Sequence, residues 1–333
     1  MVVAQLFLML IVILIAAEVF TNALEHLGER LKISEGVTGS LFAAVGTALP
    51  ETMVPLLAIF AGTENRKINE EIGVGAILGA PLMLSTLSIC LMAVFALRKR
   101  GLRGYFNPER SGLTRDLNFF LSAFTLSGAA LFVPHDTPLL RGLLALVMVL
   151  IYFIYIMLTL RASSALVQEG HGTEAQTKMF LARLGLPKNM LLILVQLALG
   201  LVLLVGGAKG FIFGIEEVSQ VFGISALLLS LMIIPIATEL PEKVNSILWI
   251  RRGKDTLAFG NITGAMVFQG TLLPAIGVML TPWVPQREVL AGIVITLVAT
   301  LWLRIMHRRG QLQVWHLGVN GILYVTYLVI ALG

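Results

Sequence analysis

Along its 333 residues the chain alternates between long apolar runs and short polar connections. An α-helix needs about 20 apolar residues to cross the hydrocarbon core of a bilayer, and most of the runs reach that length. They are too long for the strands of a membrane barrel, so we expect an all-α membrane protein. Ten transmembrane helices are predicted, at 2–20, 36–61, 71–97, 116–133, 138–160, 189–211, 223–250, 256–280, 284–303 and 313–332.

The composition agrees with this interpretation. Hydrophobic residues make up 57% of the chain and charged residues 13%, and the mean hydropathy is +0.90, whereas soluble domains carry about 25% charged residues. The net charge is +5, but no dense basic tract with interleaved aromatics is present, so we expect no nucleic-acid partner. The single cysteine, Cys90, excludes a disulfide within the chain and a multi-cysteine metal site.

The basic residues are divided unevenly between the two ends of the predicted spans. The connections after odd-numbered spans, with the span ends beside them, hold 18 of the 24 Lys and Arg residues, and those after even-numbered spans hold five. Because basic residues mark cytoplasmic loops, we expect both termini outside and the connection 161–188 in the cytoplasm. The compact length favours a prokaryotic cytoplasmic membrane.

Two segments of the chain repeat. Residues 32–51 align without gaps on residues 223–242, most clearly at T-A-L-P-E and T-E-L-P-E. A second pair of segments, 75–80 and 260–265, follows in the next span of each half. We therefore predict two five-helix repeats, and an odd number of spans per repeat inverts the second relative to the first, as in many transporters. The predicted domains are the repeat 1–160, the linker 161–188 and the repeat 189–333.

The prolines of the repeated motif predict exposed main-chain oxygens. A proline inside a helix has no N–H and leaves the carbonyl four residues earlier without its usual partner. Pro50 would free Gly46, and Pro241 would free Ala237. In lipid such carbonyls need another partner, and a cation is one.

The same motif supplies side-chain oxygens. Thr47 and Glu51 are four residues apart and share a helix face, as do Thr238 and Glu242. Carboxylates, hydroxyls and carbonyls are the hard ligands that Ca²⁺, Mg²⁺, Mn²⁺ or Na⁺ prefer. An ionised side chain at the bilayer centre costs roughly 3 kcal/mol, so two acids at equivalent positions favour a cation site. The alternative is that both glutamates are protonated and hydrogen-bonded to the main chain.

The second repeated pair is rich in small residues. Gly75 and Gly79, and likewise Gly260 and Gly264, form faces on which another helix can pack closely. We expect close helix packing as their main role.

The segments GTALPE (46–51), ATELPE (237–242), GAILGA (75–80) and GNITGA (260–265) resemble the paired motifs GTSLPE and GN-x-x-GS of the cation/calcium exchanger superfamily. This resemblance implies alternating-access exchange of Ca²⁺ for Na⁺ or H⁺. It also implies that the motif carboxylates and hydroxyls bind the divalent ion. Carried over to this chain, the implied ligands are Glu51, Glu242, Thr47 and Thr238.

The sequence departs from the family pattern where the resemblance places ligands for Na⁺. Ala48, Ala80 and Ala265 stand at motif serines. The polar position that follows the second motif is Leu84 in the first half and Gln269 in the second. Because alanine and leucine cannot coordinate Na⁺, we favour H⁺ over Na⁺ as the counter-ion.

Further polar residues lie near the motif of the second half. Glu239 and Lys243 are four residues apart in the order that favours an ion pair. The ammonium either only neutralises the acid, or snorkels away, or occupies a cation position until the site is protonated or binds a metal. Gln269 and Asn261 are either direct ligands or support the ligands.

The sequence thus predicts a secondary cation antiporter with Ca²⁺ as its default substrate, membrane lipid around it and no resident cofactor. A membrane enzyme with paired acids is the second hypothesis, but H-E-x-x-H, G-x-S-x-G and phosphate-binding glycine loops are absent from the sequence. The third is a degenerate family member that transports another cation, or that binds an ion or lipid without exchanging it.

Overall fold

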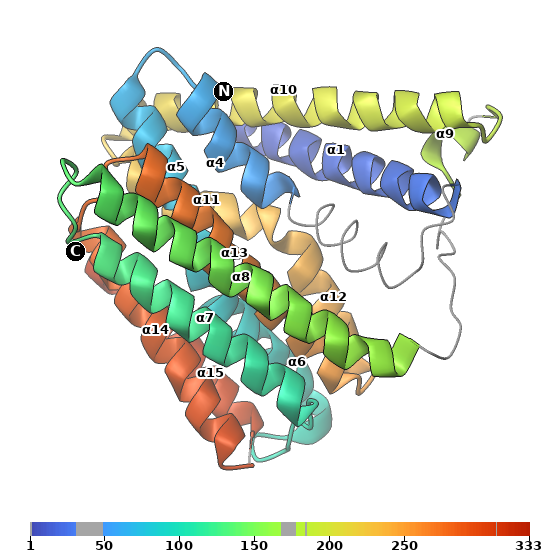
Figure 1. Cartoon of the computed structure of the whole chain (residues 1–333), viewed down its shortest axis with the longest axis vertical. Helices are drawn as coiled ribbons and strands as arrows, with labels where there is room; N and C mark the ends of the chain where they lie inside the picture. The colour runs from blue at the N-terminus through green and yellow to red at the C-terminus, as the bar shows by residue number, and fades with distance from the viewer. Residues whose placement is uncertain (1, 31–48, 168–177, 184, 311) are drawn as a thin grey trace. The chain divides into compact units, whose positions relative to one another are not determined.

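The computed structural model describes residues 2–30, 49–167, 178–183, 185–310 and 312–333, which form helices joined by short connections (Figure 1). The described residues contain no strand beyond an isolated antiparallel bridge between Tyr105 and Gln313. The helices are α1 (Val2–Arg30), α4 (Leu49–Ala61), α5 (Arg66–Met83), a π-helical turn (Leu84–Ser88), α6 (Ile89–Arg100), α7 (Arg110–Ala130), α8 (Pro138–Val167), α9 (Phe180–Arg183), α10 (Met190–Phe222), α11 (Ala226–Thr238), α12 (Leu240–Arg251), α13 (Asp255–Leu280), α14 (Arg287–Arg308) and α15 (Val314–Leu332).

Seven spans within the described residues are long and apolar enough to cross a membrane. They are Val3–Ala23, Arg66–Arg100, Pro138–Thr159, Met190–Phe222, Asp255–Leu280, Arg287–Arg308 and Val314–Leu332. Helical residues are found in all ten predicted ranges, although much of the range 36–61 lies outside the described residues. The apolar helices α4 and α11 are short, and α7 carries several polar side chains. The count of ten spans and the inverted arrangement stay predictions.

Large apolar side chains cover the outside of these helices. On α1, Phe7, Leu8, Ile11 and Ile15 are each between 52% and 57% exposed. Burying such side chains in hydrocarbon is favourable, whereas leaving them in water is not. This surface fits a protein whose solvent is lipid.

The chain forms two compact units, and each contains parts of both sequence halves. The first comprises residues 1–69 and 157–224, and the second comprises residues 70–156 and 225–333. The predicted repeats rest on sequence similarity between the halves, whereas the compact units reflect contacts in space, so the units do not test the repeats. Their boundaries at residues 160 and 189 stay predictions.

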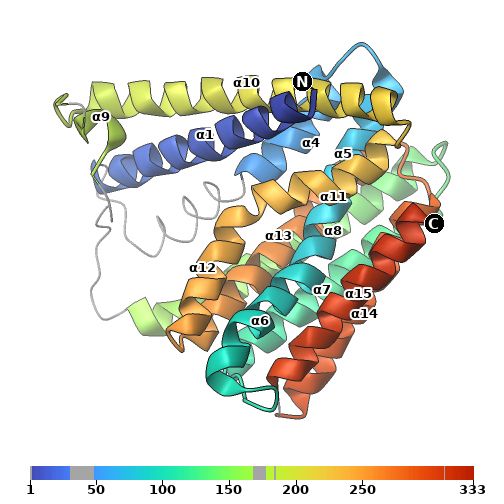
Figure 2. The same ribbon diagram turned by 180° about the vertical axis from the view of Figure 1, so that it is seen from behind.

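In the first unit, α1 and α10 lie side by side (Figures 1 and 2). Glycines spaced seven residues apart on α10 each face one bulky residue on α1, and these residues are also spaced seven apart. The facing pairs are Gly200 with Phe20, Gly207 with Ile13 and Gly214 with Leu6. A Cβ added at any of these glycines would lie between 2.9 and 3.1 Å from its partner. Small residues at such an interface let two helices pack closely where no hydrophobic force between them operates.

In the second unit, the glycine face of α5 packs against α11. A Cβ on Gly75 would lie 2.6 Å from Ser230 Cβ, and one on Gly79 would lie 2.5 Å from the Leu231 carbonyl oxygen. Close packing at these two glycines is confirmed. The corresponding pair on α13 makes no such close contact. A Cβ on Gly260 would have no described neighbour within 4 Å, and one on Gly264 would lie 3.7 Å from Tyr155 Oη, an ordinary contact distance.

The path from α5 to α6 widens into the π-helical turn Leu84–Ser88. The hydroxyls of Ser85 and Thr86 both donate to the Leu82 carbonyl, and Asn320 Nδ2 of α15 donates to the Ser85 carbonyl at 2.7 Å. Side chains that bond the main chain compete with the helical ladder. The position that the family pattern makes polar, Leu84, begins this turn.

A buried arginine fixes the end of α13. Arg141 of α8 is 3% exposed and donates to three carbonyls at and beyond the C-terminus of α13. Nε reaches Val278 at 2.9 Å, Nη2 reaches Thr281 at 2.7 Å and Nη1 reaches Pro282 at 3.1 Å. The cation satisfies carbonyls that have no helical partner and complements the helix dipole.

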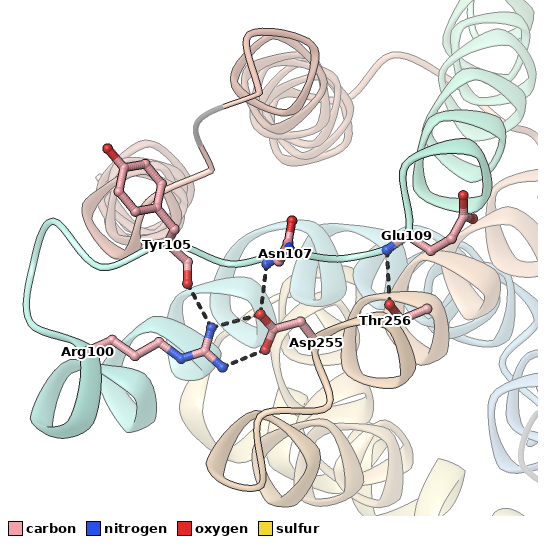
Figure 3. Close-up of polar contacts among 6 residues, drawn as sticks. All are labelled: Arg100, Tyr105, Asn107, Glu109, Asp255 and Thr256. Atoms are coloured by element: carbon pink, nitrogen blue, oxygen red, sulfur yellow. Dashed lines mark hydrogen bonds and ion pairs between the residues drawn. The ribbon is translucent and has the colours of Figure 1, made fainter.

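The opposite end of α13 is held by an ion pair (Figure 3). Asp255 accepts from both terminal nitrogens of Arg100 on α6, at 2.6 and 2.8 Å, and from the main-chain N–H of Asn107 at 2.8 Å. The same arginine donates to the Tyr105 carbonyl at 2.9 Å. A bidentate pair is stronger and more directional than a single contact. It ties α6 and the loop before α7 to the first turn of α13.

Glu109 ends this loop and caps α7. Its carboxylate accepts from the main-chain N–H groups of Ser111 at 2.6 Å and Gly112 at 2.5 Å. Slight burial raises the pKa of Glu109, but these donors and the Arg115 guanidinium outweigh it and hold the pKa below its usual value.

Candidate ion-binding site

The T-E-L-P-E motif of the second half lies at a break between two helices. The helix α11 ends at Thr238, and α12 begins at Leu240 with Pro241 as its second residue. Between them Glu239 has φ −83° and ψ 7°, outside the helical region. Figure 2 shows α11 and α12 as two helices meeting at an angle. The break occurs where a proline without an N–H interrupts the helical ladder.

Thr238 is buried, and its hydroxyl bonds the main chain. Its side chain is 1% exposed, and its hydroxyl donates to the Ile234 carbonyl at 3.1 Å. Because the single hydroxyl hydrogen is directed to the main chain, the oxygen lone pairs remain for a donor or a cation.

Glu239 and Gln269 are brought together by the fold. Gln269 of α13 donates from Nε2 to Glu239 Oε1 at 2.6 Å, and the two residues are 2% and 0% exposed. The other amide atom, Gln269 Oε1, has no hydrogen-bond donor among the described residues. A buried acceptor of this kind marks a place for a ligand or a water molecule.

Lys243 reaches back to the end of α11. Its ammonium donates to the Pro235 carbonyl at 2.8 Å and lies 3.4 Å from the Ile236 carbonyl. The side chain is 8% exposed, so this charge is largely removed from solvent. Carbonyl oxygens at the helix break are thus already bound by a cation that belongs to the chain.

Asn261 lies elsewhere on α13. Its Nδ2 donates to Ser246 Oγ of α12 at 3.0 Å, and Ser246 Oγ donates to the Ala258 carbonyl at 3.1 Å. Eight residues of helix, about 12 Å, separate Asn261 from Gln269. Asn261 therefore helps to join α12 to α13, and its role as a ligand stays a prediction.

The remaining predicted site residues are only partly described. Thr47 and Gly46 lie outside the described residues. Glu242 lies in the first turn of α12 and Ala237 in the last turn of α11, and only their main chains are described. Glu51 lies in the first turn of α4, in the other compact unit, and is 2% exposed.

One polar group was not expected from the sequence. Asp116 of α7 is 5% exposed and accepts from Tyr155 Oη of α8 at 3.1 Å. Thr263 Oγ1 of α13 lies 2.7 Å from the same carboxyl and 2.9 Å from the Phe259 carbonyl. One hydroxyl hydrogen serves only one of these acceptors, so the hydrogen position on Thr263 depends on whether Asp116 is protonated. The signal was an acid at the edge of a predicted span, beside a threonine of the GNITGA segment.

A separate cleft lies at the far end of α4 from Glu51. It has a volume of about 710 Å³ and is open to solvent. Its walls are the end of α4, the loop that follows and the C-terminal half of α10, with the charged residues Glu64, Lys209, Glu216 and Glu217. Among the described residues no three His, Cys, Asp or Glu side chains form a group that could hold a metal ion.

Comparison with known proteins agrees with the motif resemblance. Residues 1–161 and 192–333 match the family described as sodium/calcium exchanger protein. The chain is 27% identical over 305 residues to the putative antiporter CaxA of Alkalimonas amylolytica, covering 85% of this chain and 83% of that protein. It is 25% identical over 281 residues to the inner membrane protein YrbG of Escherichia coli (strain K12), covering 84% and 80%.

Solved structures share the fold. The H+/Ca2+ exchanger CAX matches with a TM-score of 0.73 at 20% identity, over 98% of this chain and 82% of that one. The sodium-calcium exchanger NCX_Mj matches with a TM-score of 0.59 at 18% identity, over 99% of both chains. The family match covers most of the sequence, and the fold agrees with it. The chain therefore belongs to the sodium/calcium exchanger protein family, within the cation/calcium exchanger superfamily, whose members are exchangers, and is an integral membrane antiporter.

Proposed function

We propose that this protein exchanges Ca²⁺ for H⁺ by alternating access. The observation that carries the proposal is the break between α11 and α12, where Thr238, Glu239 and main-chain carbonyls are buried next to one another. All of these are hard oxygen ligands of the type that Ca²⁺ prefers. Similarity to the putative antiporter CaxA and to the H+/Ca2+ exchanger CAX supports the same choice.

The proposed ligands of the ion are Glu51, Glu242, Thr47 and Thr238. This assignment rests on the alignment of the two repeats, which puts the two carboxylates at equivalent positions. The burial of Glu51 and the available oxygen of Thr238 support it.

H⁺ is proposed as the counter-ion for two reasons. The side chains Ala48, Ala80, Ala265 and Leu84 cannot coordinate Na⁺. The ammonium of Lys243 already bonds main-chain oxygens at the break, so an arriving cation competes with a charge that can lose a proton. The ammonium and Ca²⁺ would then compete for the oxygens at the break, and Lys243 Nζ would lose its proton as Ca²⁺ binds.

The test is ⁴⁵Ca²⁺ uptake into proteoliposomes, driven either by a pH gradient or by a Na⁺ gradient. We expect uptake with the pH gradient alone, and we expect Glu51→Gln and Glu242→Gln each to reduce it at least about tenfold, because each removes a charged ligand. Asp136→Asn is the control, since Asp136 is an exposed acid in the loop before α8, and it should transport like the parent.

Other outcomes would reject parts of the proposal. Uptake that requires Na⁺ would mean that carbonyls and water replace the missing side-chain ligands. Absence of Ca²⁺ flux under both gradients, with folded protein, would favour another cation or a family member that binds without exchange. Full activity of both glutamine variants would place the ion elsewhere.

A further inference from the structure

A small pocket lies at the end of α14 and the start of α15, which run side by side in Figures 1 and 2. It has a volume of about 290 Å³. It is lined by Trp302, Met306, Arg309, Gln313, Trp315 and His316. All six residues belong to the second compact unit.

The aromatic walls of the pocket are fixed by hydrogen bonds. Trp302 Nε1 donates to the His316 carbonyl at 2.8 Å, and Trp315 Nε1 donates to Gln313 Oε1 at 2.6 Å. His316 Nδ1 accepts from the Gln313 main-chain N–H at 2.9 Å. Because both indole N–H groups are already bonded within the protein, the rings offer apolar faces to an occupant.

The charge around the pocket is positive. The Arg309 side chain is exposed and lines the pocket. Arg103 belongs to the loop after α6, whose main chain is bonded to the start of α15. The carbonyls on either side of it, Leu102 and Gly104, accept from the main-chain N–H groups of Trp315 at 3.1 Å and Val314 at 3.0 Å. The carboxylates of this end are engaged elsewhere: Asp255 pairs with Arg100, and Glu109 caps α7.

Two apolar stripes lead from the surrounding lipid to this pocket. On α14 the exposed side chains recur at helical spacing at Val294, Val298, Leu301 and Ile305. On α15 the exposed residues Ile322 and Val329 follow Trp315 at intervals of seven. Tryptophan is enriched where a membrane span meets the headgroups, and arginine marks the cytoplasmic side. The pocket therefore opens where a headgroup of the inner leaflet would lie.

We propose that this pocket binds the phosphate of an anionic membrane phospholipid. Arg309 and Arg103 supply the positive charge, and arginine binds phosphate oxygens with two parallel donors. Trp302, Trp315 and Met306 pack against the glycerol and the first carbons of the acyl chains. Basic pockets between membrane helices on the cytoplasmic side suit such headgroups.

The test measures quenching of tryptophan fluorescence by brominated lipid in reconstituted vesicles. Brominated phosphatidylglycerol should quench more than brominated phosphatidylcholine at the same mole fraction. Trp302→Phe and Trp315→Phe should remove the difference, whereas the two tryptophans outside the pocket, Trp249 and Trp283, remain as internal references. Inorganic phosphate added to the vesicles should leave the difference unchanged.

The charge variants give the decisive comparison. Arg309→Gln and Arg103→Gln should each weaken the preference for phosphatidylglycerol about fivefold, which is the factor for about 1 kcal/mol per basic residue at an anionic surface. Arg252→Gln removes an exposed cation outside the pocket and should leave it unchanged. Thermal unfolding by circular dichroism checks that each variant is folded.

Equal quenching by both lipids in the parent would overturn the proposal. An equal loss in the Arg252 variant would show general surface attraction and not a pocket. Removal of the effect by inorganic phosphate would assign the pocket to a soluble anion. None of these measurements depends on transport, so they are independent of the proposed exchange of Ca²⁺.

Discussion

At the scale of single residues, Lys243 changes the interpretation of the helix break. A buried ammonium needs polar partners, and here it bonds the carbonyls of Pro235 and Ile236, of which that of Pro235 also accepts from the Glu239 main-chain N–H at 3.3 Å. The lysine therefore stabilises the break when no transported ion is present. It must release these oxygens if an incoming cation is to use them.

We predict that Lys243→Met alters the pH dependence of Ca²⁺ uptake. Without an ammonium to displace, uptake should vary less steeply with pH than in the parent. Lys243→Arg is the matched variant, because its guanidinium keeps a charge at every accessible pH, and it should be slow throughout. Uptake is measured against pH at a constant pH gradient; a Lys243→Met profile that overlays the parent's would rule out this role.

At the scale of elements, glycines determine where two helices pack most closely. The glycines of α5 admit α11, and the glycines of α10 admit α1. A side chain added at such a point overpacks the interface, and overpacking costs about 1–3 kcal/mol. Neighbouring positions on the same helix that face outward carry no such cost.

Gly207 and Gly206 allow a direct test, because they are adjacent on α10 and face different surroundings. A Cβ on Gly207 would lie 3.1 Å from Ile13 Cγ1, whereas a Cβ on Gly206 would have nothing within 4 Å. We expect Gly207→Leu to lower the free energy of unfolding by about 1–3 kcal/mol. Gly206→Leu should be neutral or slightly stabilising, since leucine is the better helix former. The stability of both variants is measured by unfolding in mixed micelles, followed by circular dichroism. Equal stability of the two variants would contradict the prediction.

At the scale of the whole molecule, the sequence predicted the helices better than it predicted which side chains of different helices contact one another. The apolar runs located the helices, because they depend on residues close in the chain. The prolines predicted freed carbonyls at the motif, but the span 223–250, predicted as one helix, is broken at Glu239. The group formed by Asp116, Tyr155 and Thr263 was missed, since it joins three helices that no local pattern relates.

The orientation of the chain is a further prediction, because basic loops mark the cytoplasmic side. In a Cys90→Ser background, His135→Cys should react with a membrane-impermeant maleimide in right-side-out vesicles. Lys178→Cys should react only after the membrane is opened. Both positions are exposed, so access to reagent and not burial decides the result. The reverse labelling pattern would place the termini inside and refute the assignment.

The seven-residue spacing shared by α1 and α10 fixes the register in which the two helices pack. Leu6, Ile13 and Phe20 all meet a glycine in one register, and a slip of one turn would press most of them against larger side chains. The two helices therefore cannot slide past each other in small steps, as helices in shear motions do. Any motion of the pair would then be that of one rigid body. The backbone would have to change conformation at the ends of the pair, such as at Gly223 after α10, where φ is 66°, a value that other residues rarely adopt.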